Sequence, residues 1–166
     1  MFKERWGPLE NGLVPNSFKQ VPLVFRNLKL ISQRLPPKVH SAAVRFVFNG
    51  FHTAKRYQRT SPCLLCNETQ TADSIEHIAS CKKIRQCIPL GYYNMRDTNR
   101  LFFLLSSHEE HTITFAMFLY AIYSVHNEIR HTGITRELKL QIGRAMHGCT
   151  LQKRDRILWN SFIGWG

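Results

Sequence analysis

The spacing of three cysteines and one histidine constrains this chain more than any other feature. Cys63 and Cys66 form a Cys-x2-Cys pair, and after ten further residues His77 and Cys81 form a His-x3-Cys pair. A Cys-x2-Cys turn lets two thiolates converge on one ion, and a second pair from another element completes a tetrahedral shell. The pattern predicts one structural Zn²⁺ held by Cys63, Cys66, His77 and Cys81.

The second pair has helical spacing. His77 and Cys81 are four residues apart, so on a helix they share one face. Asp73 is placed to cap that helix, and Glu76 stands at the third helical position, as a capping box requires. Because four protein ligands leave no position open for water or substrate, we expect a structural ion rather than a catalytic one.

The cysteines also have a simpler interpretation, as buried thiols beside a surface histidine, since free cysteine is often a small core residue. Cys87 is an alternative to Cys81, but it precedes Ile88-Pro89, outside the helical register of His77. We therefore expect it not to bind, and we expect Cys149 to serve in packing. An odd number of cysteines clustered around a histidine favours metal binding in a reducing, intracellular compartment over disulfides, with nucleus and mitochondrion both open.

The charge of the chain indicates its partner. The 166 residues include 23 Lys and Arg against 11 Asp and Glu, a formal charge of +12. This excess repels itself unless a polyanion or solvent screens it, so nucleic acid is the expected partner, with RNA favoured. A membrane partner is not expected, because no window approaches 18 uncharged apolar residues and no secretory signal opens the chain. No small-molecule substrate is indicated.

Residues 1–37 are predicted to form an extended leader. Five prolines at irregular spacing argue against a helix there, namely Pro8, Pro15, Pro22, Pro36 and Pro37.

Residues 38–166 are predicted to form a single helical domain. Apolar residues at helical spacing predict helices at about 38–51, at 112–131 with Gly133 as a stop, and at 135–147 between a Thr135 cap and Gly148. The second of these helices is apolar on more than one side, so we place it centrally. The run 101–105 suits helix or strand. The fold class is therefore mainly α, with a small CCHC zinc knuckle at about 61–85 inserted between helices.

Six cations flank the knuckle, a clustering that suits phosphate contacts: Lys55, Arg56, Arg59, Lys82, Lys83 and Arg85. Tyr57 either stacks on an unpaired base or packs in the core. A second basic cluster, followed by an aromatic residue, is either another contact or a polar terminal helix: Lys153, Arg154, Arg156 and Trp159.

The remaining histidines and acids do not indicate catalysis. His108 with His111, and His126 with His131, are interpreted as helix-surface residues or buried hydrogen-bonding residues rather than metal pairs. Because the sequence has no nucleophile elbow, Gly-rich phosphate loop or paired-carboxylate motif, we do not expect an enzyme.

Several of these segments together resemble a known family. They are His52-Thr-Ala-Lys-Arg56-Tyr-Gln, Cys63-Leu-Leu-Cys66 and Asp73-Ser-Ile-Glu-His77-Ile-Ala-Ser-Cys81. This arrangement resembles the zinc-knuckle region C-terminal to the polymerase in non-LTR retrotransposon reverse transcriptases. The later Phe118-Leu-Tyr-Ala-Ile-Tyr-Ser-Val-His126-Asn127 is similar to the following helix in some protist elements, so the resemblance covers about residues 39–131. The resemblance implies that this region binds template RNA or target DNA.

The chain also departs from that family. It contains no Asp-Asp for a polymerase and no Pro-Asp for the associated nuclease, and Asp97 and Asp155 are isolated among cations. The expected function is therefore zinc-stabilised binding of nucleic acid by a detached retroelement tail. Two alternatives stay open: an rRNA-binding structural subunit of a ribosome or other ribonucleoprotein, with proteins as further partners, and a zinc-dependent protein-interaction module.

Overall fold

The chain folds as helices around one apolar core. The computed structural model describes residues 17–88, 107–133 and 137–149. Within these ranges the elements are α2 (Ser17–Arg34), α3 (Pro37–Val47), the 3-10 turn η1 (Lys55–Tyr57), α4 (Ile75–Ser80), α5 (Lys82–Gln86), α6 (Glu109–Thr132) and α7 (Leu138–His147). They include no β-strand, only an isolated antiparallel bridge between Pro62 and Ala72. A mainly α fold with a Cys/His knuckle between helices is confirmed.

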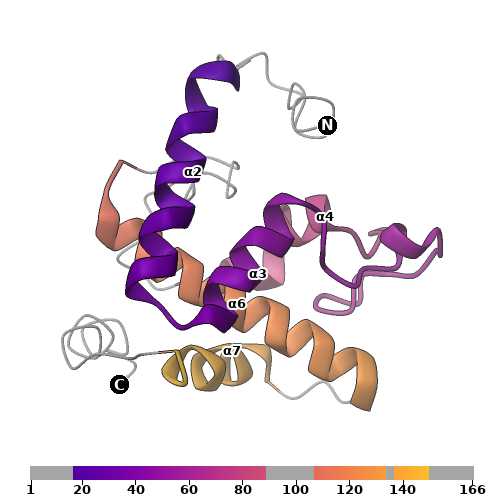
Figure 1. Cartoon of the computed structure of the whole chain (residues 1–166). Helices are drawn as coiled ribbons and strands as arrows, with labels where there is room; N and C mark the ends of the chain where they lie inside the picture. The colour runs from indigo at the N-terminus through magenta and orange to yellow at the C-terminus, as the bar shows by residue number, and fades with distance from the viewer. Residues whose placement is uncertain (1–16, 89–106, 134–136, 150–166) are drawn as a thin grey trace.

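Helix α6 is the centre of the fold. Its residues 115–119 are five consecutive buried residues, so it is covered on every side over that stretch. The helices α2, α3 and α7 pack against it (Figure 1). It ends as predicted at Gly133, whose φ of 67° closes the helix and whose N–H donates to the Ile129 carbonyl. The central placement of this helix is confirmed.

Helix α3 begins one residue before the predicted start and ends four residues before the predicted end. Pro37 occupies its first turn, where the fixed φ of proline suits a helix and no N–H is needed. The helix stops at Val47 because Asn49 has a φ of 57°, which helical residues do not adopt. Gly50 then turns the chain so that Phe51 is buried under α3 and α6, where its ring contacts Phe46 and Tyr123.

Helix α7 confirms its predicted C-terminus at Gly148, which follows His147 as the cap residue. The helix begins at Leu138, and the predicted cap Thr135 lies outside the described residues. Its buried side chains Ile142 and Met146 pack on α6. This short helix therefore closes the core from the side opposite α2 (Figure 1).

The prediction of an extended leader is wrong for Ser17–Arg34, which is helix α2. Pro22 lies inside this helix, where an interior proline costs about 3 kcal/mol. Each buried aliphatic side chain stabilises by about 1.5–3 kcal/mol, and four of them outweigh the proline. Three of them lie on the face of α2 toward α3 and α6, and the fourth directly follows the helix: Val24, Leu28, Ile31 and Leu35.

Two other expectations fall outside the described residues, namely the run 101–105 and the basic cluster of Lys153, Arg154, Arg156 and Trp159. In the ranges that the structure does describe, no helix has the length and apolar character needed to cross a bilayer.

Candidate metal centre

The four predicted ligands come together. The Sγ atoms of Cys63, Cys66 and Cys81 and one ring nitrogen of His77 all lie within 4.8 Å of one another. The Sγ of Cys66 is 3.4 Å from Nε2 of His77. In the described part of the chain, these residues form the one group of three or more His, Cys, Asp or Glu side chains close enough to hold a metal ion.

A short hairpin presents the first two cysteines. The N–H of Cys63 donates to the Thr71 carbonyl at 3.1 Å, and the N–H of Asp73 donates to the Ser61 carbonyl at 2.9 Å. Between these two extended segments the chain turns back after Cys66 through Asn67, whose φ of 54° is left-handed and whose N–H donates to the Cys63 carbonyl at 2.8 Å. Asparagine tolerates that conformation better than most residues. The turn aims both sulfurs to the same side.

Helix α4 presents His77, but its cap differs from the predicted one. Ser74 is the N-cap, and its Oγ accepts from the N–H of His77 at 3.1 Å. The predicted capping box of Asp73 and Glu76 is therefore wrong, since the cap stands one residue later. Ser74 has the extended backbone typical of an N-cap, and the Asp73 carboxylate is occupied elsewhere.

Cys81 lies at a junction rather than on the helical face predicted for it. Helix α4 ends at Ser80, and Cys81, with φ −57° and ψ 124°, separates it from α5. The hydrogen bond with the Cys63 thiol lowers the pKa of the Cys81 thiol most. The backbone N–H groups of Ile84 and Lys83, in the first turn of α5, lower this pKa further. A helix N-terminus favours a thiolate in this way because its N–H groups and dipole carry positive charge.

The electrostatics of the group favour a cation. The hydrogen bond between the thiols of Cys63 and Cys81 lowers the pKa of Cys81 and raises that of Cys63, and burial also raises the latter. The pair therefore releases its first proton readily and holds its second. A divalent cation between the sulfurs would remove this opposition, because metal ligation deprotonates a thiol outright.

The donor set fits one structural ion. Three thiolates and one imidazole are a common ligand set for tetrahedral zinc. Cys63 and Cys81 are buried, whereas Cys66 and His77 are half-buried, so the group lies just beneath the surface. Four protein donors fill a tetrahedral shell, which leaves no coordination position for a substrate.

The other two cysteines lie outside the group, as predicted. The thiol of Cys87 donates to the Lys83 carbonyl at 3.2 Å, and burial raises its pKa to about 11. Cys149 donates in the same way to the Ala145 carbonyl, and burial raises its pKa to about 12. Both remain protonated at neutral pH and pack as small apolar side chains.

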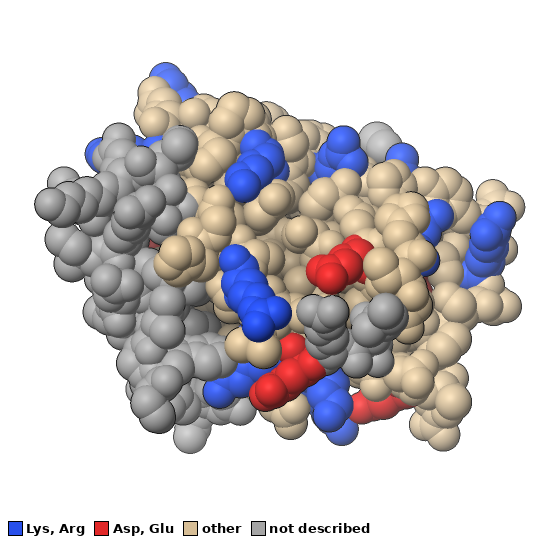
Figure 2. Space-filling view, turned by 90° about the horizontal axis from the view of Figure 1, so that it is seen from below, with Lys and Arg blue, Asp and Glu red and all other residues tan. Residues whose placement is uncertain are grey.

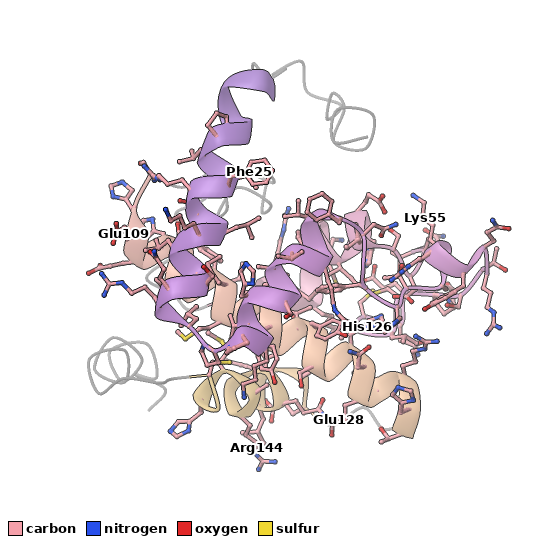
Figure 3. All side chains as sticks on the ribbon, viewed as in Figure 1. Phe25, Lys55, Glu109, His126, Glu128 and Arg144 are labelled. Atoms are coloured by element: carbon pink, nitrogen blue, oxygen red, sulfur yellow. The ribbon has the colours of Figure 1, made fainter. Side chains whose placement is uncertain are left out.

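A buried pair that sequence reasoning missed joins this centre to the core. His126 of α6, labelled in Figure 3, is fully buried, and its Nε2 lies 3.0 Å from Oδ1 of Asp73. The second carboxylate oxygen of Asp73 accepts from the N–H of Ala54 at 2.8 Å. Asp73 thus ties the metal-binding hairpin to α6 and to the segment before η1. The interpretation of His126 as a buried hydrogen-bonding residue holds for Nε2, whereas its buried Nδ1 has no hydrogen-bond partner among the described residues.

The predicted nucleic-acid contacts lie on the chain segments before and after the centre. Five of the six cations are exposed, and Lys55 also pairs with Glu76 at 3.4 Å: Lys55, Arg56, Arg59, Lys82 and Lys83. Arg85 is half-buried, and its buried Nε has no hydrogen-bond partner among the described residues. Tyr57 is 46% exposed, so its interpretation as a core residue is wrong.

Cations are also spread over the rest of the surface. On the face seen from below, Lys and Arg side chains stand apart from one another, with Asp and Glu between some of them (Figure 2). This face carries no single basic patch. On this face the basic residues of the described chain are therefore dispersed.

Comparison of the chain with protein-family models, with curated proteins and with solved structures finds no match. The resemblance to the retroelement zinc knuckle therefore stays a prediction, and the function has to be argued from the residues themselves.

Proposed function

We propose that Cys63, Cys66, His77 and Cys81 bind one zinc ion and that the folded knuckle binds nucleic acid, RNA in particular. The zinc is structural, because the four side chains complete its shell. The thiolates must stay reduced, so the protein works in a reducing compartment. The described cysteines are all free, as this requires.

One observation carries the nucleic-acid half of the proposal. Five exposed cations lie on the chain segments that enter and leave the metal centre, within a protein of formal charge +12. Of these five, Lys55 alone has a carboxylate partner among the described residues, and that exposed pair is worth little, since such pairs contribute about 0–1 kcal/mol. The knuckle therefore holds cations in place without neutralising them, as phosphate binding needs.

The spread of charge over the face in Figure 2 favours a second candidate function, which also depends on RNA binding. A structural subunit of a ribonucleoprotein contacts RNA on several sides, so its cations are dispersed rather than gathered in one place. This candidate differs from the first in where the RNA contacts lie, and one experiment separates the two.

Replacing Lys55, Arg56 and Arg59 together by alanine should weaken binding to single-stranded RNA and flatten its salt dependence. Each phosphate contact on a single strand contributes about −0.7 to the log–log slope, so three lost contacts flatten it by roughly 2. The measurement is a salt titration of affinity by fluorescence anisotropy, on protein of unchanged metal content and circular dichroism.

A matched control removes three exposed cations far from the knuckle, namely Lys29, Arg34 and Arg144. Figure 3 shows Arg144 and Lys55 on different sides of the molecule. A local binding surface predicts that this variant keeps the wild-type slope, whereas a ribonucleoprotein subunit predicts equal flattening in both. An affinity for RNA that depends neither on salt nor on the knuckle substitutions would refute nucleic-acid binding. The remaining candidate function would then be a protein-interaction module.

A further inference from the structure

Two arginines from separate elements lie against one exposed tyrosine beside the knuckle, and a third arginine packs against Gly50 nearby. Arg56 lies in η1, Arg45 in α3 and Arg130 in the last turn of α6. The guanidinium carbons of Arg56 and Arg130 lie 5.8 Å and 5.4 Å from the centre of the Tyr57 ring. The arginines at 45 and 130 are far from the knuckle in sequence, so only the fold reveals this arginine cluster, defined as Arg45, Arg56 and Arg130.

Each of these arginines is held in place by a neutral acceptor. Arg56 donates to the Gly50 carbonyl at 2.8 Å, and Arg130 donates to the His52 carbonyl at 3.2 Å. Arg45 donates to the Tyr123 hydroxyl at 2.7 Å and lies over that ring. One terminal nitrogen of each guanidinium is thereby fixed, and the other N–H groups remain for a ligand.

Gly50 is the residue that permits the arrangement. Its carbonyl accepts from Arg56, and a Cβ added to it would lie 2.9 Å from the side chain of Arg45. Any larger residue at this position would displace Arg45. The chain therefore draws the arginines of α3 and η1 together at a point where only glycine fits.

No carboxylate among the described residues pairs with the arginine cluster. The ion pairs among the described residues are those of Lys55 with Glu76 and of His126 with Asp73, and neither includes Arg45, Arg56 or Arg130. The combined field of the three reaches His52. Burial lowers the pKa of His52 most, and Arg130, Arg56 and Arg45 lower it further, whereas a side-chain hydrogen bond with Asn127 raises it. Like charges held together without a counterion cost free energy that an anion would recover.

The aromatic side chains beside the cluster indicate which class of ligand supplies the anion. The rings of His52 and Tyr57 are nearly parallel, 15° apart, with centroids separated by 6.2 Å. Tyr57 keeps 46% of its surface exposed even with these neighbours. An unpaired nucleotide offers both a phosphate for guanidinium groups and a flat base for an aromatic ring, whereas inorganic phosphate or a phosphoserine side chain offers only the first.

We infer that this cluster is a single-nucleotide site, in which Arg56, Arg130 and Arg45 bind a phosphate of single-stranded RNA and Tyr57 stacks on the adjoining base. The inference rests on the proposed RNA binding and adds residues of α3 and α6 to it. Tyr57 joins the two contacts, since both Arg56 and Arg130 lie against its ring.

The test uses the full chain loaded with zinc and two oligouridine probes of equal length, one of which has a single abasic position. Arg130→Gln should flatten the salt slope by about 0.7 on the intact probe. Tyr57→Leu should leave the slope unchanged and lower affinity for the intact probe by about 5- to 150-fold, the equivalent of losing one stacked base. The abasic position is moved along the strand to find the base that stacks on Tyr57. On the probe that lacks this base, Tyr57→Leu should lower affinity less than it does on the intact probe.

Arg144→Gln is the control, since Arg144 is an exposed cation of α7 outside the cluster. If the arginines served only to fix the knuckle to α6, Arg130→Gln would lower the melting temperature but would affect both probes and the slope no more than Arg144→Gln does. That result, or equal binding of a phosphoserine peptide at the same residues, would overturn the nucleotide site while RNA binding elsewhere stood. Absence of RNA binding by the wild-type protein would instead refute the proposed function.

Discussion

Cys63→Ser should abolish metal binding and unfold the knuckle while leaving the helical core in place. Cys63 is fully buried at the base of the hairpin, and serine supplies neither a thiolate nor its size. Apparent binding energies of structural zinc are about 10–16 kcal/mol in zinc-finger peptides, and that energy is folding energy. Losing one ligand of four should therefore remove the order of residues 61–88, and adding a chelator to the wild type should do the same. Metal content by mass spectrometry and hydrogen exchange of this segment measure both effects.

Cys87→Ser is the matched control for that substitution. Cys87 is another buried thiol of the same region, but it donates to a backbone carbonyl and lies outside the metal-binding group. A serine hydroxyl can make the same donation, so this variant should keep its metal and its protected amides. Equal loss of metal from both variants would show that general damage to packing, rather than ligation, explains the result.

His126→Leu should be the most destabilising single change in the described helical core, at about 3–5 kcal/mol. The substitution removes the partner of the Asp73 carboxylate on α6, while that carboxylate stays buried at 2% exposure. A buried carboxylate without its partner accounts for most of the free energy lost when a buried pair is broken. The N–H of Ala54 alone cannot satisfy both carboxylate oxygens. Urea denaturation followed by circular dichroism gives the change in the free energy of unfolding.

A double-mutant cycle separates the pair from the packing around it. Asp73→Leu combined with His126→Leu should cost less than the sum of the two single changes, because no buried charge is then left alone. His131→Ala, an exposed change on the same helix, should stay within about 0.5 kcal/mol of wild type. Strict additivity of the two buried substitutions would mean that Asp73 and His126 do not stabilise each other.

The sequence predicts the helices whose signals are local. In α6 an apolar stripe and a glycine stop agree, and in α7 the stop at Gly148 is equally clear. The prediction fails at α2 because five prolines were taken to exclude helix over residues 1–37. The stripe of Val24, Leu28 and Ile31 was the better signal, since tertiary burial of such a face outweighs one exposed interior proline.

The metal ligands were predictable for a similar reason. Their spacing along the chain is itself the constraint that a tetrahedral ion imposes, so Cys63, Cys66, His77 and Cys81 could be chosen before any fold was known. The cap of α4 could not be placed within one residue, because Asp73 and Ser74 are both good N-cap residues. Their roles are decided by His126, which lies 53 positions away and attracts the carboxylate inward.

The arginine cluster could not be predicted from the sequence. Arg56 and Tyr57 stand out as a basic and aromatic pair beside the knuckle, but nothing local marks Arg130 or Arg45 as their neighbours. Those contacts depend on the packing of α3 against α6 and on the turn at Gly50. Periodicity identifies which face of a helix is buried and leaves open which exposed cations will meet on the surface.

X-ray absorption at the zinc edge of the purified full chain, together with a zinc count per chain, identifies the ion and its ligand atoms. We expect one zinc per chain, with three sulfur ligands at about 2.3 Å and one nitrogen ligand at about 2.0–2.1 Å. A protein that is folded and active in RNA binding but contains no zinc, or whose zinc has oxygen ligands in place of the sulfurs of Cys63, Cys66 and Cys81, would contradict this expectation.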